Sequence, residues 1–259
     1  MGQLIRQAHA SLDVSSRRKK AEKIAHLLQL DKFPQPMRLL EIGCGSGVIA
    51  HYFAVHSSLK CHVSAVDVLD QRVEKDNYHF EVVQGSQLPF DDASFDVVIS
   101  NHVIEHVGDS AQQLTHLSEI RRVMKPMGSG YLAVPNRWML TEPHYQLPFL
   151  SWLPANLRSP YLRISGKGTH YDCRPLSARS FEKLARAAGL FATSLVLPAL
   201  SEVLGKEAHS PLLSSAVSLV PTAILERFAA FSPTLIFLLR KDQGIISLVK
   251  SSSSSHGFL

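Results

Sequence analysis

The sequence predicts an α/β fold, in which an open and mostly parallel sheet carries helices on both faces. Three observations support this prediction. Short apolar runs alternate with helical runs along most of the 259 residues. The apolar run 37–42 leads into the glycine-rich segment 43–47 and then a helical run. A second apolar run, 61–67, ends in an acid, Asp67. Repeated strand–helix units place successive strands parallel, with right-handed crossovers.

A helix precedes the sheet. Apolar side chains recur at helical spacing over residues 15–30, and Pro34 and Pro36 stop that helix before the first strand at residues 37–42. The helix that follows the glycines is expected over residues 48–56.

The central units repeat the same order. We expect, in turn, a strand at 61–67, a short helix near 71–75, strands at 80–84 and 95–100, a helix from Asp109 or Ser110 through Met124, and a strand at 131–134. The long helix begins at Asp109 or Ser110 because such side chains accept hydrogen bonds from the first free backbone amides.

The last helix begins at Ser177 and ends at Gly189, a residue type that commonly terminates helices in the left-handed conformation. Strands at 191–197 and 234–239 complete a seven-stranded sheet.

Two long insertions interrupt this order, at residues 136–176 and 201–231. Long insertions in a compact domain are usually functional, so we expect both to cap the ligand-binding edge of the sheet. The predicted organisation is an N-terminal helical segment (1–36), a domain with its insertions (37–250) and a disordered serine-rich tail (251–259).

The glycine-rich segment predicts a cofactor site at the carboxyl end of the first strand, where open α/β sheets bind ligands. Its spacing is G-x-G-x-G at Gly43, Gly45 and Gly47, not the dinucleotide pattern G-x-G-x-x-G, and no P-loop lysine follows. Glu41, two residues earlier, suits a cationic ligand better than a pyrophosphate. Asp67, at the end of the second strand, can accept hydrogen bonds from ribose hydroxyls. A helix cap is the structural alternative for this residue.

The segment LEIGCGSG resembles motif I of the class I S-adenosylmethionine (SAM) methyltransferases. The later stretch LPFDDASFDVVISNHVIEHV resembles the ubiquinone/menaquinone-methylase-like branch, the type 11 group. The resemblance covers residues 39–135. It implies a SAM-dependent methyltransferase with a Rossmann-like sheet whose last strand is antiparallel.

The turn and the resemblance together imply the residues that bind the cofactor. They are Glu41, Gly43, Gly45, Gly47, Asp67, Val68, Ser86, Gln87, Leu88, Asn101 and His102. The branch often carries an acid that contacts the adenine in the loop before L-P-F. This chain has Gly85-Ser86-Gln87 there, so Ser86 or the backbone near Gln87 and Leu88 would take that role.

Methyl transfer from a sulfonium is a direct displacement, and a base is needed only if the acceptor holds its proton. The candidate catalytic residues are His106, which the resemblance places near the site, and His144, Tyr145 and His170 in the first insertion. Aromatic packing is an equally good explanation for the insertion residues. No pair of histidines four residues apart accompanies an acid, so the sequence predicts no metal.

The acceptor is expected to be small, hydrophobic or lipid-linked, and methylated on oxygen. VPNRWMLTEPHYQLPFLSWLP is similar to bacterial methylases, some of them associated with lipid-like substrates, and residues 208–225 contain no Asp, Glu, Lys or Arg. Alternatives are a non-catalytic methyltransferase-like partner and an NAD-dependent oxidoreductase. The sequence after the fourth strand, Asn101-His102-Val103-Ile104, weakens a protein or RNA methylase.

Composition narrows the location and the partners. The net charge is a modest +5 without a nucleic-acid-binding module, so no nucleic-acid partner is expected. Three cysteines without metal spacing favour a reducing, cytoplasmic compartment. The basic run 17–20 indicates a solvated helix face, or peripheral contact with an anionic membrane. No signal peptide and no membrane-spanning helix are predicted. The sequence leaves the oligomeric state open.

Overall fold

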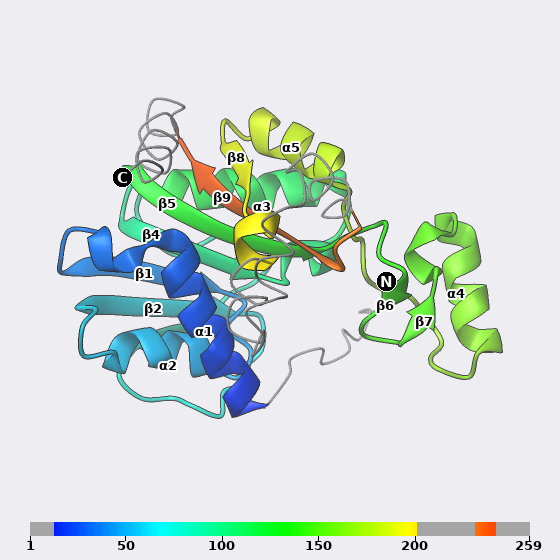
Figure 1. The fold of residues 1–259 in the computed structure, drawn as a ribbon, viewed down its shortest axis with the longest axis horizontal. Helices are drawn as coiled ribbons and strands as arrows, with labels where there is room; N and C mark the ends of the chain where they lie inside the picture. Colours follow the sequence, from blue (N-terminus) through cyan, green and yellow to red (C-terminus); the bar gives the residue numbers. More distant parts are fainter. Residues whose placement is uncertain (1–12, 201–230, 242–259) are drawn as a thin grey trace, which may run out of the picture.

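The fold is known from a computed structural model that describes residues 13–200 and 231–241. Its main sheet contains β1 (Met37–Ile42), β2 (Cys61–Asp67), β3 (His79–Val82), β4 (Phe95–Asn101), β5 (Met124–Pro135), β8 (Phe191–Ser194) and β9 (Thr234–Arg240). The strands lie in the order β3-β2-β1-β4-β5-β9-β8 (Figure 1). All pairs from β3 to β5 are parallel, whereas β9 is antiparallel to both neighbours. The predicted mostly parallel sheet with an antiparallel last strand is therefore confirmed.

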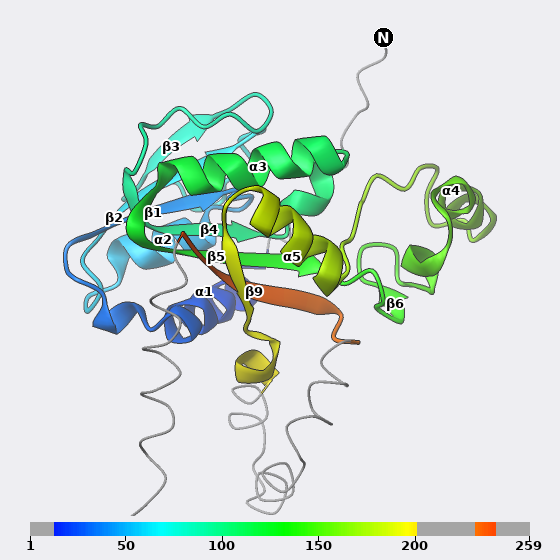
Figure 2. The ribbon, with the colours of Figure 1, turned by 90° about the horizontal axis from the view of Figure 1, so that it is seen from above.

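Helices cover both faces of this sheet. The helices α1 (Val14–Leu28) and α2 (Val48–Val55) lie on one face, and α3 (Ser110–Val123) and α5 (Ala178–Ala187) lie on the other (Figure 2). Successive residues of β1 serve different cores, since Leu39 packs under α1 and α2 while Leu40 packs under α3 and α5. A strand that is buried on both faces consists almost entirely of apolar residues. This is why β1 could be predicted from the sequence.

The expected helix termini are confirmed. Asp109 accepts hydrogen bonds from the backbone amides of Ala111 and Gln112, and the Gln112 side chain accepts from the Asp109 amide, which completes a capping box. Ser177 caps α5, and Gly189 follows that helix with a φ of 73°.

The short helix expected at residues 71–75 is wrong, because residues 68–78 form no helix. The amides of Val73 and Glu74 donate to the Ser46 carbonyl at 2.9 and 3.1 Å. The Arg72 guanidinium pairs with Asp70 at 2.9 Å. The two bonds to Ser46 tie the segment to the glycine turn, so tertiary contacts and not a local helix set its backbone.

Two strand boundaries also differ from expectation. β5 begins at Met124, directly after α3, and residues 125–128 leave the register between the pairs Phe95–Met124 and Val97–Ser129. β8 ends at Ser194 instead of residue 197. Most of the expected second insertion (residues 201–230) and the tail lie outside the described residues.

The segment after β5 forms a separate small lobe at one end of the sheet, which we call the cap (residues 136–176; Figure 1). It contains β6 (Thr141–Glu142), β7 (Leu147–Pro148), the 3-10 turn η3 (Leu150–Trp152) and α4 (Ala155–Ile164). Its own apolar core consists of Tyr145, Leu147, Leu150, Leu162, Tyr171 and Cys173. Among the described residues, no helix has the length and apolar character needed to cross a bilayer.

The turn between β1 and α2 is left-handed at all three glycines, with φ of 72° at Gly43, 52° at Gly45 and 75° at Gly47. A Cβ at Gly47 would overlap the Tyr78 hydroxyl and the Glu74 carbonyl. The turn thus requires glycine for its backbone conformation and, at Gly47, for its close packing against residues 72–78.

We predict that Gly47→Ala lowers the free energy of unfolding by about 2–4 kcal/mol, from left-handed strain together with displacement of the Tyr78 segment. Gly166→Ala is the matched control, since Gly166 has a φ of 70° but open space around it. It should cost only about 1–2 kcal/mol. Urea unfolding followed by circular dichroism measures both, and equal losses would contradict the packing role of Gly47.

Candidate active site

The end of β2 holds the glycine turn in place. The amides of Gly43 and Cys44 donate to the Val66 carbonyl at 2.8 and 3.2 Å. The Gly45 amide donates to Asp67 Oδ2 at 2.8 Å. Asp67 therefore faces the turn, as a residue that contacts a ligand lying across the turn must.

Asp67 is not a helix cap. Its Oδ1 accepts from the amides of Val68 at 2.7 Å and Leu69 at 3.4 Å, but no helix begins there. These bonds fix the carboxylate at the rim, where it is half-buried. Val68, also predicted to contact the cofactor, is half-buried beside it.

Three buried oxygen atoms near the turn have no hydrogen-bond partner within the described part of the chain. They are Glu41 Oε2, Ser46 Oγ and Asn101 Oδ1. Glu41 and Asn101 belong to the ends of the neighbouring strands β1 and β4, and Ser46 belongs to the turn itself. Buried polar atoms are rarely left without a partner, so this edge of the sheet suits a ligand that carries several donors. The ammonium and hydroxyl groups of SAM fit that requirement.

Glu41 is 2% exposed. Burial raises the pKa of its carboxyl to about 8, while the charge of Arg17 on α1 and a hydrogen bond from the Ala50 amide oppose the shift, and the charge of Asp67 adds to it. The residue is therefore largely protonated at neutral pH in the ligand-free protein. A cation placed beside it would favour the charged form.

The loop after β3 offers fewer contacts than expected. Leu88 is buried, its amide donates to Glu119 Oε2 at 2.9 Å, and its carbonyl accepts from Arg122 at 3.0 Å. The backbone of Leu88 is thus engaged with α3. Ser86, which is half-buried, and Gln87, which is exposed, are the predicted residues of this loop that can turn toward an adenine.

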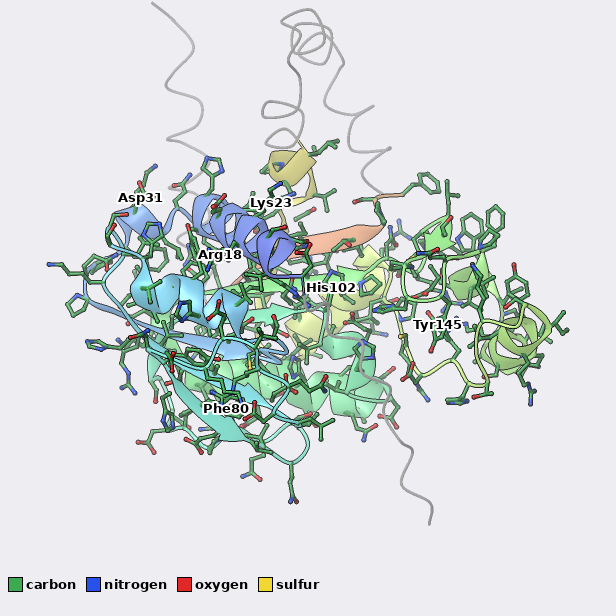
Figure 3. All side chains as sticks on the ribbon, turned by 90° about the horizontal axis from the view of Figure 1, so that it is seen from below. Arg18, Lys23, Asp31, Phe80, His102 and Tyr145 are labelled. Carbon is green, nitrogen blue, oxygen red and sulfur yellow. The ribbon has the colours of Figure 1, made fainter. Side chains whose placement is uncertain are left out.

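His102 lies just after β4, on the side of the sheet that adjoins the cap (Figure 3). We call this junction, formed by His102, His106 and His144, the mouth. Its backbone is left-handed, with a φ of 59°, and its amide donates to the Ala133 carbonyl at 2.9 Å. Its ring Nδ1 lies 3.2 Å from Oε1 of the fully buried Glu105. These contacts fix the imidazole at the expected cofactor edge.

Two predicted catalytic histidines meet across the mouth. His106 comes from the 3-10 turn η2 (Ile104–His106) and His144 from the turn between β6 and β7. Their ring centroids are 5.7 Å apart, with the ring planes at 80°. The cap is thereby brought against the sheet at the end of β4.

A buried carboxylate orients His144. Its Nδ1 lies 2.7 Å from Oε1 of Glu142, whose Oε2 accepts from the Tyr145 amide at 2.8 Å. Burial lowers the pKa of His144, but the hydrogen bond and charge of Glu142, with the charges of Glu105 and Asp172, outweigh it, and the net pKa lies above its usual value.

The other two predicted catalytic residues, Tyr145 and His170, lie apart from this pair of histidines. Tyr145 is buried, and its hydroxyl donates to Asp172 Oδ1 and to the His170 carbonyl, both at 3.3 Å. Burial raises the pKa of this hydroxyl, and the charge of Asp172 adds to the rise. The His170 ring is exposed, and its Nδ1 lies 3.4 Å from Ser159 Oγ. Two of the four predicted residues, His106 and His144, therefore meet, whereas Tyr145 packs in the cap core and His170 is exposed on the cap.

Four residues at the mouth were not predicted: Glu105, Glu142, Asp172 and Cys173. Cys173 Sγ lies 3.8 Å from His106 Nδ1 and 3.6 Å from Asp172 Oδ1. Glu105 and Glu142 lie next to or near a predicted histidine in the sequence, and this proximity could have identified them as candidates. No local pattern links Cys173 to His106, 67 residues earlier.

Comparison with known proteins agrees with this geometry. The family described as "Methyltransferase domain" matches residues 15–195. A ubiquinone biosynthesis O-methyltransferase of Maricaulis maris is 32% identical over 112 residues, which cover 39% of this chain and 41% of that protein. A mitochondrial ubiquinone biosynthesis O-methyltransferase of Schizosaccharomyces pombe is 30% identical over 164 residues, or 58% of this chain and 50% of that one. The chain thus spans half or less of the length of these relatives.

The fold has known counterparts. A methyltransferase solved in complex with the Trm112 methyltransferase activator of Haloferax volcanii superposes with a TM-score of 0.53 at 19% identity, covering 92% of this chain and 100% of the other. The family match excludes the NAD-dependent oxidoreductase alternative. The chain therefore belongs to the methyltransferase-domain family.

Proposed function

We propose that this methyltransferase transfers the methyl group of SAM to a hydroxyl oxygen of a small, apolar, lipid-like acceptor, with quinone precursors as the first class to test. The observation that carries the proposal is the meeting of His106 and His144 between the cofactor edge and an aromatic cap. The similarity to ubiquinone biosynthesis O-methyltransferases supports the choice of acceptor and atom.

SAM, when bound, supplies the electrophilic methyl group and its leaving group. The chain contributes binding and orientation. The unpartnered Glu41 Oε2 suits the ammonium of the cofactor, and Asp67 at the rim suits the ribose hydroxyls. Asn101 offers a further buried acceptor at the end of β4.

The cap suits an acceptor with one polar end. His106 and His144 present ring nitrogens that can hold a hydroxyl by hydrogen bonding. The aromatic residues Tyr145 and Tyr171 belong to the apolar core of the cap, together with Cys173, which adjoins His106. On its outer side the cap exposes large apolar side chains, namely Trp138, Leu140, Phe149, Trp152, Leu157 and Ile164. Such a surface favours peripheral contact with the lipid phase that would hold the acceptor. We also propose a reducing, cytoplasmic compartment, and the three free cysteines support this proposal.

The proposal predicts a graded acceptor preference. Phenolic quinone precursors with prenyl tails of increasing length should be methylated with rising kcat/KM, because each buried methylene adds roughly 0.8 kcal/mol of binding free energy. Amine acceptors of matched size should react poorly. Product mass spectrometry with isotopically labelled SAM measures the transfer and locates the methyl group. Cofactor binding without turnover across the panel would instead indicate a non-catalytic partner.

Two cap variants test the acceptor side of this experiment. His144→Gln should lower kcat/KM for the phenol at least tenfold while leaving the affinity for SAM unchanged, because the ring faces the mouth. His170→Gln should have a smaller effect, because its ring is exposed beside Ser159. The reverse order would contradict the proposed acceptor position.

A second prediction concerns proton linkage at Glu41. Its carboxyl, with a pKa near 8, should release a proton when the cationic cofactor binds. Affinity for SAM should therefore rise with pH, by up to about tenfold per unit, and level off above about pH 8. The groups that act on this carboxyl are the charges of Arg17 and Asp67 and the Ala50 amide, which donates a hydrogen bond to it.

Isothermal titration calorimetry in buffers of different ionisation enthalpy counts the released proton. Glu41→Gln should remove the component that belongs to the protein and leave only the titration of the ligand itself. The same proton count in wild type and variant would show that Glu41 does not contact the cofactor cation.

A further inference from the structure

We propose that His106, Asp172 and Cys173 form a site for a transition-metal ion of the zinc class, and that His144 approaches the same ion from the turn between β6 and β7. This site goes beyond the proposed methyl transfer and does not depend on the identity of the acceptor. An ion held there would face the acceptor hydroxyl in place of the ring nitrogens of His106 and His144. It also departs from the expectation of no metal that the sequence alone supports.

The distances fit a metal polyhedron. Cys173 Sγ lies 3.8 Å from His106 Nδ1 and 3.6 Å from Asp172 Oδ1, and the three donor atoms lie within 4.8 Å of one another. Zinc bonds of about 2.3 Å to sulfur and about 2.0–2.2 Å to nitrogen or oxygen give donor–donor separations of about 3.3–3.8 Å in a tetrahedron. Small side-chain movements would therefore bring these donors around one ion.

A second set of donors reaches the same sulfur. Atoms of Glu142, His144 and Cys173 also lie within 4.8 Å of one another. Glu142 Oε1 engages His144 Nδ1 at 2.7 Å, so the Nε2 side of that ring is the one directed to other partners. A carboxylate that holds one nitrogen of a histidine while the other nitrogen binds metal is the usual outer-shell arrangement of metal sites.

Glu105 gives His106 the corresponding support. Its Oε1 lies 3.9 Å from His106 Nε2, on the opposite side of the ring from Cys173. Glu105 is 0% exposed, and its Oε2 has no hydrogen-bond partner among the described residues. A divalent cation bound through His106 would compensate this buried carboxylate, since buried charge is costly without a partner.

The donor set selects the class of metal. Each of the two sets combines a sulfur, an imidazole nitrogen and a carboxylate oxygen, a combination that suits zinc, whereas Mg²⁺ and Ca²⁺ prefer oxygen ligands alone. Cys173 is 2% exposed and belongs to the core of the cap. On metal binding its thiol would lose the proton to solvent, and the thiolate would form the bond to the metal.

The test uses the full chain, purified without chelator. We expect about one zinc per chain by elemental mass spectrometry. After zinc removal, added Co²⁺ should produce the intense charge-transfer absorption of a cobalt–thiolate bond, and Zn²⁺ should displace it. Cys173→Ser should abolish this band and weaken zinc binding, whereas Cys61→Ser, a half-buried cysteine at the start of β2, should leave both unchanged.

Further variants keep the test decisive if Cys173→Ser does not fold. Glu105→Gln removes the carboxylate charge that lies 3.9 Å from His106 Nε2 and 3.2 Å from His102 Nδ1, and it should weaken zinc binding by about 10–100-fold. His106→Gln should weaken it at least as much. No zinc uptake and no cobalt–thiolate band in the wild type, or a band lost equally in Cys61→Ser, would overturn the proposal. Because every readout is metal binding, its failure would leave the proposed methyl transfer untouched.

Discussion

The hydrogen bonds between the glycine turn and the end of β2 position everything else at this edge of the sheet. Val66 accepts from two amides of the turn, and Asp67 accepts from a third. The left-handed backbone of the turn favours glycine, and at Gly47 a Cβ would overlap the Tyr78 hydroxyl and the Glu74 carbonyl. The start of α2, the rim carboxylate and the buried Glu41 are consequently fixed relative to one another before any ligand arrives, which lowers the entropic cost of binding.

The order of the parallel strands places further residues beside the glycine turn. β4 lies beside β1, so Asn101 and His102 lie at the same edge as the glycine turn. The chain then runs through η2 to α3 and returns in β5, whose carboxyl end leads into the cap. Because β4 and β5 are neighbours, the cap begins next to the residues that follow β4, and His144 meets His106 there. The topology therefore brings together histidines from two distant segments.

Much of this arrangement could be predicted from sequence. The strands β1, β2 and β4 are short apolar runs ended by Glu41-Ile42, Asp67 and Asn101, and the caps of α3 and α5 have clear local signals. The helix expected at 71–75 is absent, and the amides of Val73 and Glu74 bond to the carbonyl of Ser46, which is distant in sequence. Tertiary contacts of that kind leave no trace in local periodicity.

The candidate site likewise has one part that local sequence predicts and another that depends on tertiary contacts. Glu41, the glycines and Asp67 follow a fixed local spacing and lie together as expected. The cluster of His106, Glu142, Asp172 and Cys173 draws on η2 and both ends of the cap, and no spacing rule joins such segments. The sequence predicts His170 as an acceptor-site residue because it precedes Tyr171. Adjacent residues in an extended segment point to opposite sides, so Tyr171 is buried and His170 is exposed.

The most direct measurement of the central claim is a crystal structure of the protein with S-adenosylhomocysteine. We predict that the adenosyl group lies across the turn from Gly43 to Gly47, with the ribose hydroxyls bonded to Asp67 and the ammonium near Glu41. A ligand bound elsewhere, or an Asp67 carboxylate that makes no contact with the ribose, would contradict the account.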